Sequence, residues 1–252
     1  MSYCIIGVMG HVEDSKGNFR GVKGAGKDTL VDAWIAQYGK DYETLKLPLA
    51  AYTKQVLQSR YALKDMDMDH KGKDQMLGLS DNPEASFRDL CIQLATSVVR
   101  EELKCDEFWL HYVNKRIRAF IQSFEEELEE YSGAPSDSSD DRRRLAREEI
   151  VKVLKKHMPN WSETGKKKII FIPDIRFQNE YDYFKRKYGQ HCHMVQVKRI
   201  VEQVSPQASD QHISNQSHPN MKPECILSND GTPDELAYSL QEKVILGVIN
   251  IE

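Results

Sequence analysis

Short apolar runs alternate with longer amphipathic stretches along most of the chain. Each apolar run has the length of a buried parallel strand, and these runs lie at 3–8, 43–49, 168–172 and 193–197. The amphipathic stretches have helical periodicity and lie at 29–38, 50–63, 86–103, 108–124, 142–157, 181–188 and 231–246. Because strands and helices alternate, we expect an α/β fold whose parallel sheet is covered by helices.

A glycine-rich segment precedes the first predicted helix. Gly21, Gly26 and Lys27 match the pattern G-x-x-x-x-G-K, in which glycines let the backbone approach phosphate and the lysine reaches the β- and γ-phosphates. The helix that follows would present its positive end to the same phosphates. The alternative is a glycine-rich surface turn beside a helix cap. We predict that the segment binds ATP through Gly21, Gly24, Ala25, Gly26, Lys27, Asp28 and Thr29.

This loop departs from the usual motif in two respects. The motif has Ser or Thr after the lysine as a magnesium ligand, whereas this chain has Asp28 followed by Thr29, so we divide the Mg²⁺ role between the two. The loop also normally follows the first strand directly, but residues 10–20 intervene here. We interpret them as an insertion in the form of a small hairpin.

A second candidate element follows the apolar run 168–172. Ligands of doubly wound sheets bind at the carboxyl ends of strands, so Asp174 is a candidate magnesium ligand, like the acid that ends a Walker-B strand. Arg176 would face the same crevice and bind a substrate phosphate through its guanidinium fork, and Glu180 would pair with it or contact the substrate sugar. The alternative is a structural Asp–Arg ion pair. Lys27, Asp174 and Arg176 are therefore the predicted catalytic residues.

Six segments together resemble the phage-type deoxynucleoside monophosphate kinases. They are residues 24–29, 49–54, 88–109, 173–180, 210–214 and 228–236. They occur in the family's order and span most of the chain apart from 10–20 and 118–166. Some positions depart from the family's pattern: Ile92 stands where a glutamine is usual, Ala95 replaces a glycine, and Asn215 replaces an acid. These departures concern base recognition more than phosphoryl transfer.

The resemblance implies an enzyme that uses ATP and Mg²⁺ to convert a deoxynucleoside monophosphate (dNMP) to its diphosphate. It implies a P-loop nucleoside-monophosphate-kinase-like fold in a single domain. The core would comprise 1–49 and 167–252, with a substrate-side helical region at 50–117 and a lid-like insertion at 118–166. The implied substrate-binding residues are Lys54, Arg88, Gln93, Arg100, Arg176 and Glu180.

The insertion at 118–166 is a candidate lid. Kinases of small phosphorylated substrates must exclude water, and a mobile segment that brings arginines over the transferred group is a common solution. The alternative is a charged hairpin of two solvated helices. The sequence does not choose among the candidate lid arginines, which are Arg142, Arg143, Arg144 and Arg147.

Composition narrows the choice of partners. With a formal net charge of −4, the chain has no global positive field, so we expect a small-molecule partner and no nucleic acid. No apolar run reaches membrane-spanning length, and the five cysteines form no C-x-x-C pair, so we expect no membrane partner and a cytoplasmic location, in the host cell if the protein is phage-encoded. The sequence does not decide whether the protein forms a homodimer.

Two other functions remain as alternatives. The first is a P-loop kinase of another phosphorylated metabolite, such as a coenzyme precursor. The second is an ATP-hydrolysing, nucleotide-regulated binding protein that acts on DNA, which the acidic charge balance disfavours.

Overall fold

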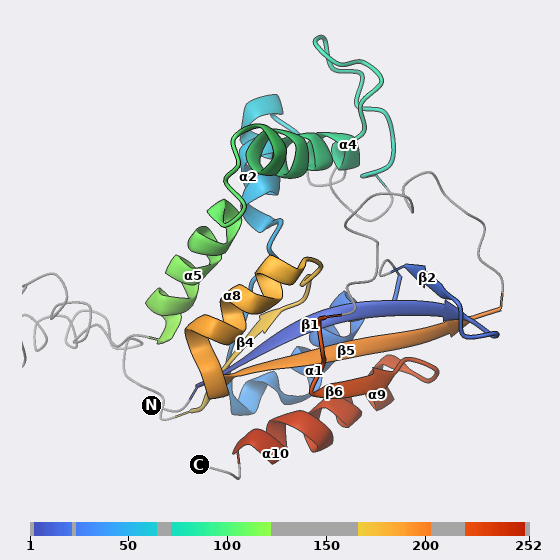
Figure 1. Cartoon of the computed structure of the whole chain (residues 1–252), viewed down its shortest axis with the longest axis vertical. Helices are drawn as coiled ribbons and strands as arrows, with labels where there is room; N and C mark the ends of the chain where they lie inside the picture. The colour runs from blue at the N-terminus through green and yellow to red at the C-terminus, as the bar shows by residue number, and fades with distance from the viewer. Residues whose placement is uncertain (1–2, 22–23, 65–71, 122–165, 203–219, 250–252) are drawn as a thin grey trace, which may run out of the picture.

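The computed structural model describes residues 3–21, 24–64, 72–121, 166–202 and 220–249. Five strands form a parallel sheet in the order β3-β4-β1-β5-β6 (Figure 1). The predicted α/β architecture with a helix-covered parallel sheet is therefore confirmed. The strands are β1 (Tyr3–Asp14), β3 (Glu43–Lys46), β4 (Lys168–Ile172), β5 (Cys192–Val201) and β6 (Cys225–Ser228).

The first strand is longer than its apolar run suggested. β1 continues past residue 8 to Asp14, and β2 (Phe19–Gly21) then pairs with it antiparallel. The carboxylate of Asp14 accepts hydrogen bonds from the backbone N–H groups of Lys16 and Asn18, both at 2.9 Å, and so fixes the turn. The predicted hairpin between strand and glycine loop is thus present, and it carries the chain back toward the centre of the sheet.

Helices cover both faces of the sheet and bury two apolar clusters. α1 (Lys27–Tyr38) and α9 (Pro233–Leu240) pack on one face, where Trp34 of α1 is fully buried against Phe171 of β4. α5 (Phe108–Ile121) and α8 (Gln178–Tyr188) pack on the other, where Leu110 and Phe184 are fully buried. After α9 the chain continues as the π-helix η7 (Gln241–Ile245) and α10 (Leu246–Ile249). A short 3₁₀ helix follows α1, η1 (Gly39–Asp41), and another follows α8, η4 (Gly189–His191).

A helical region stands apart from the sheet (Figure 1). It consists of α2 (Ala51–Tyr61), α4 (Phe87–Ile92) and the π-helix η2 (Gln93–Glu102). The region has its own small core, formed by Leu57, Ala85, Phe87 and Leu90. Ser86 caps α4 and forms a capping box with Asp89. The predicted helix at 86–103 therefore exists, with its second half wound as a π-helix.

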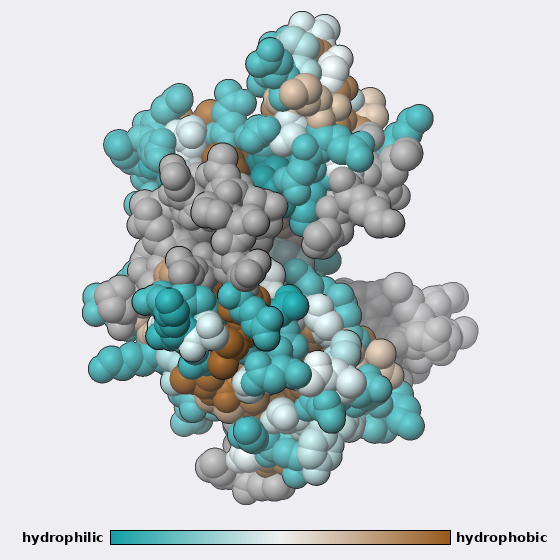
Figure 2. Space-filling model, turned by 90° about the vertical axis from the view of Figure 1, so that its right-hand side faces the viewer, coloured by the Kyte–Doolittle hydropathy of each residue, from teal (hydrophilic) through white to brown (hydrophobic). Residues whose placement is uncertain are grey.

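The surface of the described residues is mostly hydrophilic (Figure 2). An apolar area is exposed on the lower, sheet-containing part in that view, and among the sheet's large apolar side chains Ile200 and Ile226 are exposed. No helix in the described ranges combines the length and apolarity needed to cross a membrane.

The topology creates a natural ligand-binding position between β1 and β4. These strands are neighbours, but α1, which follows the β1–β2 hairpin, lies on one face, and α8, which follows β4, lies on the other. Adjacent strands whose following helices diverge in this way leave a crevice at their carboxyl ends, where ligands of open α/β sheets bind. The glycine loop and Asp174 both belong to this edge.

Candidate active site

The glycine loop is anchored to the sheet through its carbonyl groups. Asn229, just after β6, donates its side-chain N–H to the Ala25 carbonyl at 2.8 Å, and Arg199 of β5 donates to the Gly24 carbonyl at 3.1 Å. In a trans peptide the N–H points opposite to the C=O. The N–H groups of Ala25 and Gly26 therefore point away from these two anchors, as a phosphate-binding backbone requires.

The two anchors were not predicted from the sequence. Asn229 lies in the segment 228–236 that resembles the kinase family, but no role was assigned to it there. Its position directly after a strand that ends at the same edge as β1 is the signal that could have identified it. Arg199 carries no comparable signal, because β5 was expected to end at residue 197 and in fact extends to Val201.

Gly26 has a steric reason to be glycine as well as a conformational one. Its φ is +98°, in the left-handed region, and a Cβ there would lie 2.3 Å from the side-chain nitrogen of Asn229. Gly24 has a similar φ of +78°, but a Cβ at Gly24 would meet no atom within 4 Å.

We expect Gly26→Ala to weaken ATP binding more than Gly24→Ala does. Both substitutions place a side chain in left-handed backbone, at about 1–2 kcal/mol, but only Gly26→Ala also displaces Asn229 from the loop. Calorimetric titration with a non-hydrolysable ATP analogue measures the difference. Adding Asn229→Ala to Gly26→Ala should remove the clash, and equal losses for the two single variants would contradict the steric role.

Lys27 lies where the motif predicted it, as the first residue of α1, and its side chain is buried. Burial lowers the pKa of Lys27; the charge of Asp174 opposes this shift, while the guanidinium of Arg176 adds to it. These charges can act on Lys27 only because they are close to it. The structure therefore brings together Lys27, Asp174 and Arg176, which the sequence predicted as one site.

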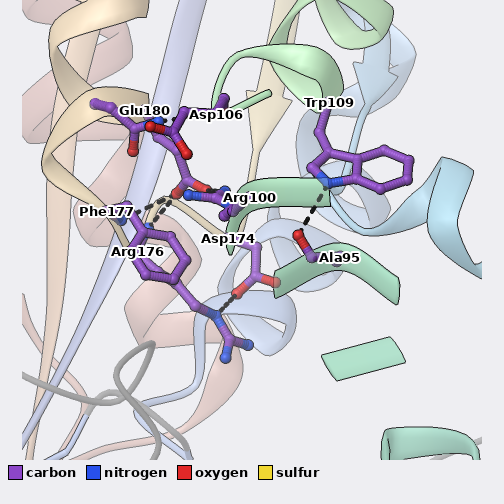
Figure 3. A network of polar contacts seen from close by, with 9 residues as sticks. Ala95, Arg100, Asp106, Trp109, Asp174, Arg176, Phe177 and Glu180 are labelled. Carbon is purple, nitrogen blue, oxygen red and sulfur yellow. Dashed lines mark hydrogen bonds and ion pairs between the residues drawn. The ribbon is translucent and has the colours of Figure 1, made fainter. Parts of the chain in front are cut away.

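Asp174 and Arg176 form an ion pair at the tip of β4. The Nε of Arg176 donates to Oδ1 of Asp174 at 2.7 Å, and the two terminal nitrogens of the guanidinium point away from Asp174 (Figure 3). Burial alone would raise the pKa of Asp174, but Arg176, Lys27 and Lys54 outweigh it and hold that pKa below its usual value. Asp174 raises the pKa of Arg176 in turn. Both groups are thus ionised at neutral pH.

Lys54 and Arg88 extend the positive charge into the helical region. Lys54 is on the first turns of α2, close enough to lower the pKa of Asp174. Burial raises the pKa of the Cys91 thiol to about 11, although both Lys54 and Arg88 act to lower it. The guanidinium of Arg88 donates to the carboxylate of Asp74 from both Nε and Nη2, with an Nη2–Oδ2 distance of 3.0 Å. The cationic side chains of Lys54 and Arg88 therefore extend the positive charge from the strand tip at Asp174 toward α4.

The remaining predicted substrate residues differ in exposure. Glu180 and Arg100 are buried or nearly so and are bonded to each other, with an Nη2–Oε1 distance of 2.5 Å. The expected pairing of Glu180 with Arg176 occurs through the backbone N–H of Arg176, at 2.8 Å, rather than through its guanidinium. Gln93 is exposed at the start of η2.

Of the predicted ATP-binding residues, Gly21 lies at the end of β2 with a φ of +136°.

The candidate magnesium ligands suit a metal that is shared with phosphate oxygens. Asp28 and Thr29 are exposed on the first turn of α1, and Asp28 lies 3.3 Å from the ammonium of Lys46, which also bonds Asp32. Among the described residues, no group of three or more His, Cys, Asp or Glu side chains could hold a metal ion. Mg²⁺ in kinase sites usually has one or two carboxylates, with phosphate oxygens and water completing its shell. Asp174 with Asp28 or Thr29 fits that requirement.

Residues 122–165, most of the predicted lid, fall outside the described residues, as do Arg142, Arg143, Arg144 and Arg147, whereas 118–121 form the end of α5. The segment 210–214 and Asn215 also lie outside the described residues.

Comparison with known protein families finds none that matches this sequence. No curated protein matches it at a significant level either. The resemblance to deoxynucleoside monophosphate kinases therefore stays a prediction from the motifs.

Proposed function

We propose that this protein is an ATP-dependent kinase that transfers the γ-phosphate of ATP to a dNMP. The observation that carries the proposal is that the buried Lys27, at the end of a glycine loop, and the Asp174–Arg176 ion pair, at the tip of β4, lie at the same edge of the sheet, where their charges influence one another. Lys54 adds a cation to the same place from the helical region. Two elements that handle anions thus meet at one edge of the sheet, as transfer between two phosphates requires.

In the proposed mechanism, the residues position charges and form no covalent intermediate. The N–H groups of the glycine loop and the ammonium of Lys27 hold the phosphates of ATP. Arg176, oriented by Asp174, binds the acceptor phosphate through its terminal nitrogens, and Lys54 neutralises charge on the same group. Asp174 and either Asp28 or Thr29 would hold magnesium, which would supply positive charge to neutralise the phosphates. No general base is needed, because a phosphate oxygen is already an anionic nucleophile.

A coupled ADP-release assay with every dNMP and NMP tests the proposal. We expect ADP release to depend on a dNMP and the phosphorylated product to be the corresponding diphosphate, identified by chromatography. The variant Arg176→Met should raise the KM for the acceptor and lower kcat, because the fork contacts the acceptor phosphate, while the KM for ATP stays near its original value.

Other outcomes of the same assay would reassign the protein. Turnover with a different phosphorylated metabolite, and with no nucleotide, would retain the kinase mechanism and replace the substrate. ATP hydrolysis that no acceptor changes would contradict the kinase proposal and favour the nucleotide-regulated binding protein.

A further inference from the structure

A buried ion pair lies beside the proposed site and joins it to the helical region (Figure 3). Arg100, on η2, bonds Oε1 of Glu180, on α8, and their side chains are 13% and 3% exposed. The guanidinium of Arg100 also lies over the ring of Phe177, 4.1 Å from its centre. A pair so enclosed is held in one arrangement, because breaking it would leave a buried charge without its partner.

The second oxygen of Glu180 holds the backbone that carries Arg176. Oε2 accepts hydrogen bonds from the N–H groups of Arg176, at 2.8 Å, and Phe177, at 3.0 Å. The direction in which the Arg176 side chain leaves the main chain is therefore fixed by Glu180, just as Asp174 fixes its far end. Glu180 therefore acts on Arg176 through its main chain.

We propose that Glu180 and Arg100 are positioning residues that aim Arg176 at the acceptor phosphate, and that neither side chain contacts substrate. The two oxygens of Glu180 already accept bonds from three N–H donors, and its side chain is almost fully enclosed. This differs from the roles implied by the resemblance, in which both residues would bind substrate. The catalytic part of the inference rests on the proposed function.

The Arg100–Glu180 pair also connects the helical region to α8, which follows the tip of β4. The segment that carries Arg100 is held to α5 by a hydrogen bond from Trp109 Nε1 to the Ala95 carbonyl, at 3.4 Å. Asn179 of α8 reaches the Asp106 carbonyl, at 3.3 Å, next to the start of α5. The placement of Arg176 therefore depends on the placement of η2 relative to α8.

Three variants separate the positioning role from a substrate contact. Glu180→Met removes both carboxylate oxygens, so the guanidinium of Arg100 and the backbone N–H groups of Arg176 and Phe177 lose their acceptor. Arg100→Met removes only the guanidinium, and Arg100→Lys keeps the charge but loses the planar fork. The matched control is Arg186→Met, because Arg186 is also on α8 and pairs with Glu107 at 3.3 Å, but in an exposed position.

The first measurement is amide hydrogen exchange of Arg176 and Phe177, which requires no enzymatic activity. We expect exchange to become about tenfold faster in Glu180→Met and somewhat faster in Arg100→Met, since the amides lose a charged acceptor or its orientation. Arg186→Met should leave exchange unchanged. Unchanged exchange in Glu180→Met would overturn the proposal. A melting curve of each variant checks folding, and Arg100→Lys serves as the test should Glu180→Met fail to fold.

The second measurement is steady-state kinetics with the acceptor found in the ADP-release assay. In Arg100→Lys and Arg100→Met we expect kcat to fall about tenfold and the KM for the acceptor to rise, as a weaker form of the Arg176→Met defect, since both variants misdirect the fork that contacts the acceptor phosphate. A rise in acceptor KM with kcat intact would mean that Arg100 binds substrate and would overturn the proposal. Absence of turnover in the unmodified protein would refute the proposed function, whereas the exchange measurement would still decide whether Glu180 holds this backbone.

Discussion

Replacing Lys27 with methionine is expected to lower kcat for phosphoryl transfer about 10²–10³-fold, the usual effect of removing one group that stabilises transition-state charge. The side chain is buried at the start of α1, and the charge of Asp174 acts on its ammonium. Methionine fills a similar volume without the charge, and the fold should therefore persist. Single-turnover kinetics with saturating ATP and acceptor measures the chemical step directly.

Lys46→Met is the matched control for this prediction. Lys46 is also a lysine near the start of α1, but its ammonium contacts Asp28 and Asp32, at 3.3 and 2.7 Å. Removing it changes the net charge by the same amount. We expect less than a tenfold effect, because surface ion pairs contribute about 0–1 kcal/mol. Equal losses in the two variants would show that only the local charge matters, and would remove Lys27 from its proposed role.

The main part of the sheet could be predicted because its strands are fully buried. Continuous apolar runs such as 168–172 and regular helix–strand alternation specify a parallel sheet with covered faces, and these features lie within short stretches of sequence. The meeting of Lys27 with Asp174 was predictable for the same reason. Asp174 follows the buried strand β4, the glycine loop follows the hairpin at the end of β1, and these two parallel strands end at the same edge of the sheet.

Other features depend on contacts between distant residues and could not be predicted in this way. β6 is only four residues long and carries one buried apolar side chain, Leu227, so it lacks a readable pattern. Asn229 gains its role only when β6 lies next to β5. Likewise, Arg100 and Glu180 are far apart in the sequence, and nothing local indicates that they pair with each other rather than with a ligand.

Asp174→Asn is expected to lower kcat about 10²–10³-fold, a loss comparable to that of Lys27→Met. The carboxylate offsets the charges of Arg176, Lys27 and Lys54, and these three groups together hold its pKa below the usual value. Asparagine keeps an oxygen that can accept from the Nε of Arg176, but it has no charge. The three cations at the strand tip would then lose the carboxylate that acts on all of them. Asp32→Asn, which removes an exposed carboxylate from α1, is the matched control and should have less than a tenfold effect.

The dependence of the rate on Mg²⁺ concentration separates the two interpretations of Asp174. If the carboxylate helps to hold magnesium, the concentration needed for half-maximal rate should rise severalfold in Asp174→Asn and stay constant in Arg176→Met, because only the first variant loses a metal ligand. If Asp174 serves only as the structural partner of Arg176, asparagine should preserve their hydrogen bond, and the loss should stay near tenfold with an unchanged magnesium requirement. The second result would leave the site with its phosphate-binding groups but would assign the metal to Asp28 or Thr29 on α1.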